Sequence, residues 1–462
     1  MHRRSMRGAL VVVAAATLTL AACGSKTPAT PSAGGGSTPA SDTAVASASS
    51  SDTGMASGSD TGMASSSSSE SGGGSESSSG ASSSGGGGAA GGSGSGLTIT
   101  PVVQIDTSGK EVKSAAGAAP ADPAGDGKAK CSGVSLAFAG AQTGDNAALG
   151  INIFDGAKVA LDAHNKANPG CQVKMTPFDT AGDQQQATQV APKIVADTSI
   201  IGLLGPAFSG ETGATENIFS EAGLVSVTAS ATRVDLTTQG FKTFFRGLAN
   251  DGVQGPSVAK YMVDTLKYKK VCVIQDDSAY GTGLADAVKK GLGSVADNSC
   301  AQDVKTKQKD FSAVVTAIQT AAPDAIFYSG YYAEGAPLVS QLRSASVTAA
   351  FVSADGVNDP QFVKQAGDAS KDAILSCPCG PSPEKFAADY KAANNNAAPG
   401  VYSVEAYDLT TIMLKAIDSG VKDRAGMVDY VKKYNGAGLA RQYKWDDKGE
   451  LTSALIWIYK VQ

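Results

Sequence analysis

Residues 271–292, V-C-V-I-Q-D-D-S-A-Y-G-T-G-L-A-D-A-V-K-K-G-L, show the pattern that decides the fold. The apolar run Val271–Gln275 has the length of a buried strand, the loop Asp276–Gly283 follows it, and a helix-length segment comes next. Other strand-length runs alternate with helix-length segments from residue 131 onward: Val134–Ala139, Gln172–Phe178, Ile200–Leu204, Val225–Thr228, Ala325–Ser329, Ala350–Ser353 and Ala373–Ser376. This alternation predicts an α/β fold with two mostly parallel sheets and helices on both faces of each sheet.

Composition divides the chain before residue 131 from the chain after it. Residues 24–96 hold 25 Ser and 19 Gly among 73 positions, so they cannot bury enough apolar surface to offset ordering entropy, and we expect a disordered tether. The whole chain has 462 residues with 38 Lys and Arg against 43 Asp and Glu. This mildly acidic balance argues against a nucleic-acid partner. The only histidines are His2 and His164, the latter expected on a polar helix face, which excludes most His-dependent hydrolase and metal chemistry.

The first 22 residues have the plan of an export signal, with three arginines, an apolar run and then small residues. The segment Leu20–Cys23 resembles the lipobox of bacterial lipoproteins, which predicts that Cys23 is lipidated and anchors the mature chain to the membrane. An ordinary cleaved signal followed by a chance cysteine is the alternative. We expect the tether to run over residues 23–130, although Leu97–Gln104 also has the pattern of a strand.

Six further cysteines in an exported chain suggest disulfides. Cys131 and Cys171 precede successive strands of the first sheet, Cys272 and Cys300 lie at successive strands of the second, and Cys377 and Cys379 remain as a tight pair. Neighbouring parallel strands can bring such residues within disulfide distance. Buried free thiols are the alternative for any of these pairs. The spacing does not favour a metal site.

Several strand-to-helix loops carry hydroxyl, aromatic or acidic residues. Gly205–Thr212 has the GxxxxG spacing of a phosphate loop, but Glu211 stands where such a loop needs lysine, so we expect no nucleotide and no cofactor. Ser209 could instead hold a carboxylate at a helix N-terminus, or act only as a helix cap. Hydroxyls at 229–232 on one lobe would face Tyr280, Tyr331 and Asp355 on the other. Such a pocket complements a zwitterion.

From residue 131 to the C-terminus the chain resembles the leucine/isoleucine/valine-binding protein family, the type 1 periplasmic solute-binding proteins of ABC importers. The supporting runs are Thr143-Gly144, Phe154–Ala157, Ala229–Thr237, Asp251–Tyr261, Tyr280–Leu292, Lys309–Ser312, Tyr328–Glu334, Asp355–Val357 and Trp445–Glu450. The resemblance implies two doubly wound parallel-sheet lobes joined by a multi-strand hinge. Lobe 1 would comprise residues 131–248 and 377–443, and lobe 2 residues 249–376 and 444–462.

The resemblance also implies the roles of the site residues. Ser209 and Thr232, with backbone at Ser230 and the adjacent Ala231, would bind the ligand carboxylate. Tyr331 and Asp355 would bind its ammonium group, and Leu149, Tyr280 and Tyr402 would line the cleft. Three features depart from the family. Asp355 is one methylene shorter than the usual Glu, Leu149 replaces an aromatic residue, and Gly182 and Phe208 stand at the positions of the disulfide in the best-studied branch.

The resulting hypothesis is an extracytoplasmic, lipid-anchored and monomeric receptor. It would capture an amino acid, with a branched-chain amino acid favoured, and deliver it to an ABC permease without catalysis. A sensor, or a receptor for an amide, urea or aromatic acid, is the alternative. A hydrolase is excluded because a single histidine remains in the mature chain and no GxSxG motif lies near it.

Overall fold

The computed structural model describes residues 96–113 and 119–462, which belong to one structural unit, Gly87–Gln462. The predicted signal at 1–22, the lipidated Cys23 and the tether up to residue 95 lie outside the described residues, so they stay predictions.

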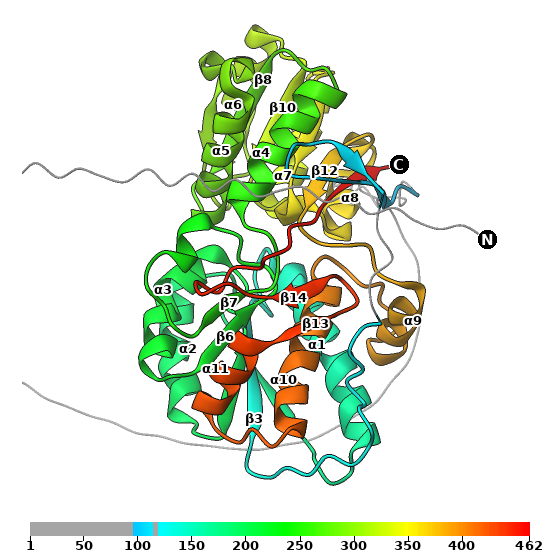
Figure 1. The fold of residues 1–462 in the computed structure, drawn as a ribbon. Helices are drawn as coiled ribbons and strands as arrows, with labels where there is room; N and C mark the ends of the chain where they lie inside the picture. The colour runs from blue at the N-terminus through cyan, green and yellow to red at the C-terminus, as the bar shows by residue number, and fades with distance from the viewer. Residues whose placement is uncertain (1–95, 114–118) are drawn as a thin grey trace, which may run out of the picture. The chain divides into compact units, whose positions relative to one another are not determined.

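The first lobe is built around a five-stranded sheet in which every neighbouring pair is parallel. Phe138 belongs to the same apolar cluster as residues of α1 and α10, whereas its neighbour Ala137 packs with residues of α2 and α3. This alternation shows that helices cover both faces of the sheet (Figure 1). In sheet order the strands are β4 (Lys174–Asp179), β3 (Ser135–Gly140), β5 (Ile200–Leu204), β6 (Val225–Thr228) and β7 (Phe244–Arg246). The helices are α1 (Ala147–Ala167), α2 (Gln184–Ala196), α3 (Ser209–Glu221), α9 (Glu384–Ala393), α10 (Ser403–Asp418) and α11 (Arg424–Lys433), and the hairpin β13 (Asn435–Ala437) and β14 (Gln442–Lys444) follows.

The second lobe is built around an eight-stranded sheet with a parallel core and an antiparallel edge. Val273 packs with residues of α4 and α5, and its neighbour Ile274 with residues of α6 and α7, so this sheet is also covered on both faces. In sheet order the strands are β2 (Glu111–Val112), β1 (Ile99–Ile105), β15 (Ile456–Val461), β12 (Ile374–Cys377), β11 (Ala350–Ser353), β10 (Ala325–Ser329), β8 (Val271–Asp276) and β9 (Gln302–Val304). The helices are α4 (Asp251–Lys260), α5 (Ala279–Leu292), α6 (Ser312–Ala321), α7 (Tyr332–Ser344) and α8 (Pro360–Ala366).

The predicted alternation of strands and helices is confirmed, and β5, β6, β10 and β11 have the predicted bounds. The tether expected over 23–130 is wrong for its last part, and the strand pattern at Leu97–Gln104 is confirmed. Ile99–Ile105 forms β1, which pairs antiparallel with the C-terminal strand β15 and buries Ile105 to 1% exposure. The Ala/Pro/Gly-rich stretch that follows also contacts the fold, since Ala121 N–H donates to the Ala437 carbonyl. The stretch around Ala121 therefore packs on the fold despite its low apolar content, because its backbone hydrogen-bonds to the first lobe.

The chain passes between the lobes after β7, after β12 and after β14 (Figure 1). The first two crossings fall at 247–250 and 378–383, next to the predicted segments near Phe245–Ala249 and Ser376–Gly380. The third lies farther along than the predicted Arg441–Trp445, because β14 still pairs with β13 in the first lobe and the crossing follows it at 445–455. Three connections of this kind can act as a hinge.

The structure joins the three cysteine pairs that the sequence suggested, Cys131–Cys171, Cys272–Cys300 and Cys377–Cys379. The strand pairing explains the first two, because β3 neighbours β4 and β8 neighbours β9 in parallel registers. His164 is not on a polar face as expected but fully buried, with its Nε2 atom 2.8 Å from the Asp418 carboxylate. Cys171 lies near this pair, yet its sulfur is already bonded to Cys131.

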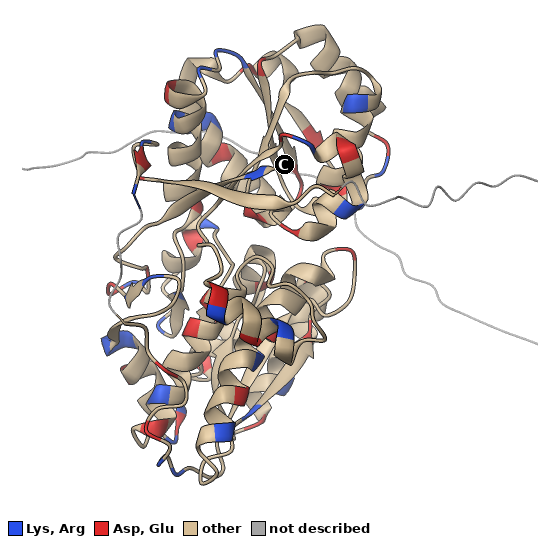
Figure 2. Cartoon of the chain, turned by 90° about the vertical axis from the view of Figure 1, so that its right-hand side faces the viewer, with Lys and Arg blue, Asp and Glu red and all other residues tan. Residues whose placement is uncertain are grey.

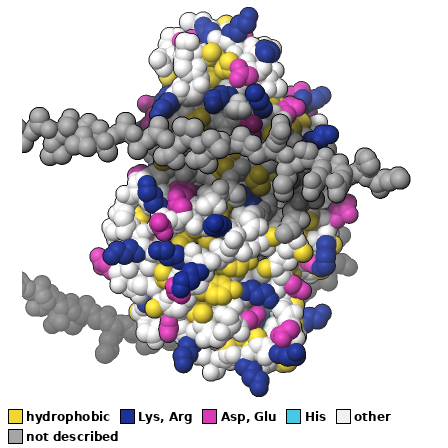
Figure 3. Space-filling view, viewed as in Figure 1, with side chains coloured by type: hydrophobic (Ala, Val, Ile, Leu, Met, Phe, Trp, Pro, Cys, Tyr) yellow, Lys and Arg dark blue, Asp and Glu magenta, His cyan; other side chains and the backbone are white. Residues whose placement is uncertain are grey.

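Charged side chains of both signs are scattered over the helices and loops of both lobes (Figure 2). On the face shown in Figure 3 the basic and acidic side chains of the described residues are interspersed. Among the described helices, none combines the length and apolarity needed to cross a membrane.

Candidate functional site

The loops that follow the strands of the two sheets meet around a cavity of about 330 Å³. Its wall comes from both lobes and is made of Leu149, Ile153, Ala207, Phe208, Ser209, Ser230, Tyr280, Tyr331, Asp355, Gly356 and Tyr402. Seven of the nine residues predicted to bind ligand are in this set: Leu149, Ser209, Ser230, Tyr280, Tyr331, Asp355 and Tyr402. The structure therefore brings together residues that lie more than 250 positions apart in the chain.

The first lobe contributes hydroxyl groups from two neighbouring loops. Ser209 is the first residue of α3, after the N-cap residue Phe208, so the alternative that Ser209 is only the helix cap is wrong. Its Oγ accepts a hydrogen bond from Arg233 N–H at 3.2 Å, which leaves the hydroxyl hydrogen available to a ligand. The Ser230 hydroxyl instead donates to the Ala207 carbonyl at 2.5 Å. Ser209 is thus the clearest donor for an anion on this wall.

Ala231 and Thr232 are fully buried next to the wall but do not line the cavity. The Thr232 hydroxyl has no hydrogen-bond partner within hydrogen-bond geometry among the described residues. Its predicted contact with a ligand carboxylate therefore stays a prediction and requires a small movement of this loop.

Arg246 of β7 holds this loop in place and was not predicted from the sequence. Its guanidinium is fully buried and donates to the carbonyls of Ala231 and, at 2.9 Å, Arg233. The same group pairs with Glu450 at 3.0 Å. The sequence offered no signal for Arg246, because a strand of three residues gives no pattern from which its burial could be inferred.

The second lobe contributes one buried carboxylate, Asp355, which is 3% exposed. Its Oδ1 atom accepts hydrogen bonds from the Gln254 amide at 2.8 Å and the Tyr280 hydroxyl at 3.1 Å. Burial raises the pKa of Asp355, while Gln254 and the phenols of Tyr402 and Tyr280 oppose the shift. A cationic ligand group placed beside Asp355 would favour its ionised form.

A second buried acid, Asp251, lies at the start of α4 behind this carboxylate. Both of its oxygens lack a partner within hydrogen-bond geometry among the described residues. Burial, followed by the charge of Asp355, raises the pKa of Asp251 to about 8. Two buried carboxyl groups, those of Asp251 and Asp355, therefore lie close enough for their charges to interact.

Aromatic side chains close the cavity. The rings of Tyr280 and Tyr331 lie 5.0 Å apart, and Phe208 of the first lobe meets Tyr331 of the second edge-on at 5.3 Å. A Cβ atom at Gly182 would lie 3.8 Å from the Phe208 ring, so the two positions that form a disulfide in the best-studied branch are still neighbours here. Ile153, Ala207, Phe208 and Gly356 were missed in the sequence because apolar residues on strand ends and helices look the same whether they face a core or a cavity.

Comparison with known proteins assigns the family. A model of the family described as periplasmic binding protein matches residues 133–462. The chain belongs to the periplasmic binding protein family. An amino acid binding protein of Pseudomonas aeruginosa is 30% identical over 335 residues, which are 71% of this chain and 90% of the relative. The Leu/Ile/Val-binding protein BraC3 of Rhizobium johnstonii is 31% identical over 327 residues, 69% of this chain and 89% of the relative.

Solved structures agree with this membership. The branched-chain amino acid transporter substrate binding protein of Streptococcus pneumoniae, determined in complex with isoleucine, matches with a TM-score of 0.65 and 26% identity over 70% of this chain and 95% of that one. The predicted resemblance to leucine/isoleucine/valine-binding proteins and the predicted type 1 fold are confirmed. A periplasmic binding protein acts outside the cytoplasm and binds its solute without converting it, as the sequence analysis expected.

Proposed function

We propose that this periplasmic binding protein captures an amino acid in the cavity between its lobes and delivers it to an ABC permease. The observation that carries the proposal is the division of polar groups across the cavity. The Ser209 hydroxyl and the N-terminus of α3 suit a carboxylate on one side, and Asp355 suits an ammonium on the other. An α-amino acid presents these two groups on one carbon, so it can satisfy both walls at once.

The remaining lining supports an aliphatic side chain, as in the branched-chain amino acids. Leu149, Ile153, Ala207 and Phe208 turn apolar atoms toward the cavity. A relative named as a Leu/Ile/Val-binding protein and a similar structure with isoleucine bound point to the same ligand class. The shorter Asp355 in place of the usual Glu leaves room for the ammonium to sit closer to the second lobe or to bind through water.

A calorimetric screen of the purified protein tests this proposal. Leucine, isoleucine, valine and alanine form one arm, and acetamide, urea and benzoate form the other. We expect saturable binding in the first arm only. Binding confined to the second arm would replace the proposal with a receptor for amides or aromatic acids, and the absence of binding in both arms would contradict it.

We further propose that the chain works as a lipid-anchored monomer held to the membrane by Cys23. The Leu20–Cys23 segment and the Ser/Gly-rich stretch after it support this proposal. A Cys23→Ala variant should leave the membrane fraction and appear in the soluble extracytoplasmic fraction, with unchanged amino-acid affinity. Retention on membranes washed at high salt would show that another attachment exists.

A further inference from the structure

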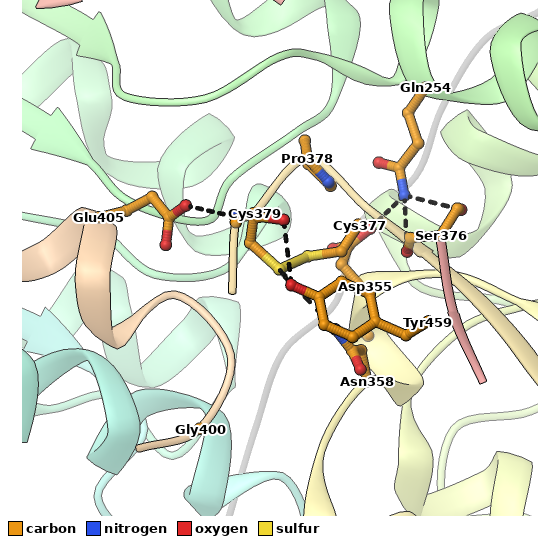
Figure 4. Close-up of a disulfide and its surroundings, with 12 residues drawn as sticks. Gln254, Asp355, Asn358, Ser376, Cys377, Pro378, Cys379, Gly400, Glu405 and Tyr459 are labelled. Carbon is orange, nitrogen blue, oxygen red and sulfur yellow. Dashed lines mark hydrogen bonds between the residues drawn. A yellow bond between two sulfur atoms is a disulfide. The ribbon is translucent and has the colours of Figure 1, made fainter. Parts of the chain in front are cut away.

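The Cys377–Cys379 disulfide closes a ring around a single proline at the point where the chain leaves β12 for the first lobe (Figure 4). The other two disulfides join residues 40 and 28 positions apart. In the chain-entropy description, a cross-link restricts the unfolded chain less as the loop it closes becomes shorter. This bond therefore adds least to global stability, and its main effect is on the local backbone of the hinge.

On the β12 side, the disulfide adjoins the groups that hold Asp355. The Gln254 amide donates to the backbone carbonyl and the hydroxyl of Ser376, each at 3.2 Å, and to Asp355 at 2.8 Å. Ser376 immediately precedes Cys377. The Gln254 amide therefore contacts both the residue next to the disulfide and the Asp355 carboxylate.

On the other side, the disulfide adjoins the start of α10, where Tyr402 lies. Arg441 donates to the Pro378 carbonyl at 2.6 Å, and Gly380 N–H donates to Glu405 at 3.2 Å. Arg441 and Glu405 form an ion pair at 2.6 Å with both side chains 1% exposed. Glu405 lies in the first turn of α10, directly after Tyr402 at the start of that helix. The backbone on both sides of the disulfide is therefore hydrogen-bonded to residues that lie next to the ligand cavity.

A second cavity, of about 770 Å³ on the same basis as the 330 Å³ of the ligand cavity and including space open to solvent, reaches the disulfide from outside the ligand cavity. Cys379 lines it, and Tyr402 lies on the walls of both cavities. One hydrogen-bond donor stands beside the Cys379 sulfur, the Asn358 amide at 3.7 Å, whereas the Tyr459 hydroxyl donates to the Cys379 carbonyl at 3.3 Å. A donor in the position of the Asn358 amide stabilises a thiolate.

We propose that Cys377 and Cys379 form a reversible redox modification site that controls the ligand cavity. The co-reactant is a thiol reductant, either a small monothiol or a dithiol. Its thiolate enters the second cavity and bonds to the Cys379 sulfur, the Cys377–Cys379 bond breaks, and Cys377 leaves as a thiolate that takes up a proton. A second thiol then attacks the mixed disulfide, releases the oxidised reductant and frees Cys379. Two electrons and two protons are transferred in total.

Reduction removes the ring that fixes residues 377–379, so Ser376 and Gly380 lose a shared constraint and the cavity wall loosens. Both thiols stay on one tripeptide, so reoxidation by the oxidised form of the reductant, through the same mixed disulfide in reverse, needs only local closure and no choice of partner. A cross-link between distant residues would not return as readily once the chain between them had moved.

The test begins with thiol titration of the full chain. The protein is equilibrated in buffers of graded reduced and oxidised glutathione, alkylated and analysed by mass spectrometry for each cysteine pair. We expect Cys377 and Cys379 to be labelled at a reduced-to-oxidised ratio at least tenfold lower than either other pair. Simultaneous reduction of all three pairs would overturn the proposal.

The second measurement follows the consequence in the hinge. Amide hydrogen exchange over residues 374–382 should be faster in the selectively reduced protein and in a Cys377→Ser/Cys379→Ser variant than in the oxidised protein. Unchanged exchange in both would overturn the proposal. The matched control is Cys131→Ser/Cys171→Ser, which removes a disulfide away from the cavity and should leave exchange over 374–382 unchanged.

Isoleucine affinity gives a third readout, which rests on the proposed function. We expect at least fivefold weaker binding after reduction and in Cys377→Ser/Cys379→Ser, and unchanged binding in the Cys131→Ser/Cys171→Ser control. Equal affinity of oxidised and reduced protein would overturn control of the cavity. If the oxidised protein binds no amino acid, the proposed function fails, and the titration and exchange measurements alone decide the redox proposal.

Discussion

At the scale of single residues, Asp355 is the group on which we expect the proposed amino-acid binding to depend. Asp355→Asn removes the charge partner of the ligand ammonium and should weaken binding by about 2–5 kcal/mol, the range for truncating one partner of a buried charged pair. Calorimetry measures the loss. Asp389→Asn, at an exposed position on α9, is the matched control and should bind as the unchanged protein does. Equal affinities for the two variants would place the ammonium elsewhere.

Asp251 makes stability depend on pH in the opposite sense from a salt-bridged acid. Its folded-state pKa of about 8 lies above the ordinary value. Below pH 4 both states hold the proton; as the pH rises to 8 only the folded state keeps it, so stability falls by up to about 1.4 kcal/mol per pH unit. Asp251→Asn should therefore match the unchanged protein near pH 4 and exceed it at pH 8 in urea unfolding. Asp286→Asn, at an exposed position, is the control, and parallel curves for all three proteins would contradict the shift.

The polar part of the candidate site could be predicted from the sequence more fully than the apolar part. Hydroxyls, aromatics and an acid placed directly after strands identified Ser209, Tyr331 and Asp355, because the ends of parallel strands share one edge of a sheet. Arg246 and Glu450 could not be paired in advance. Their contact depends on where the third crossing segment returns, 204 residues along the chain.

At the scale of elements, apolar run length identified the buried parallel strands and the edge strand β4, whereas the shortest strands and β15 escaped. β7 and β9 have three residues each, too few for a pattern, and β9 has only one buried residue. β15 shows no strict alternation of burial, because Ile458 and Tyr459 are both buried in the strand that lies between β1 and β12. Strands of this kind form by pairing with strands far away in the chain, and local composition does not reveal that pairing.

The ordering of β1 can be tested within the strand itself. Ile105 is 1% exposed in an apolar cluster with Ile456 and Ile458, whereas Val102 is 55% exposed. Ile105→Ala should lower the free energy of unfolding by about 2–5 kcal/mol through lost burial and the cavity it leaves. Val102→Ala should change it by less than about 0.5 kcal/mol. Chemical denaturation compares the two, and equal small effects would mean that β1 contributes nothing to the fold.

At the scale of the whole molecule, ligand binding should change how the lobes lie. The Asn152 amide of α1 donates to Asp359 at the start of α8 at 2.7 Å, and Phe208 meets Tyr331 across the cavity. A zwitterion adds a further link between the same walls, so it should shift the population toward this closed arrangement. Saturating isoleucine should therefore reduce the radius of gyration in small-angle scattering.

Asn152→Ala sharpens this test. Loss of one interlobe hydrogen bond should weaken isoleucine binding by about 1 kcal/mol and increase the radius of gyration of the ligand-free protein. Lys158→Ala, on the same helix and bonded only within the first lobe at the Ala393 carbonyl, is the control. A radius that never changes, together with proven binding, would show that closure is complete without ligand.

The pairing of β1 with β15 also makes this protein suitable for circular permutation. Thr98 and Gln462 exchange backbone hydrogen bonds of 2.8 and 2.9 Å, so Thr98 at the start of the described fold lies beside the last residue of the chain. A short linker could join them, and the chain could be cut elsewhere without losing a strand pair. A circular permutant opened in the crossing at 378–383 would carry its new ends at the hinge. A pair of fluorophores fused there would convert movement of the lobes into an optical signal for the bound solute.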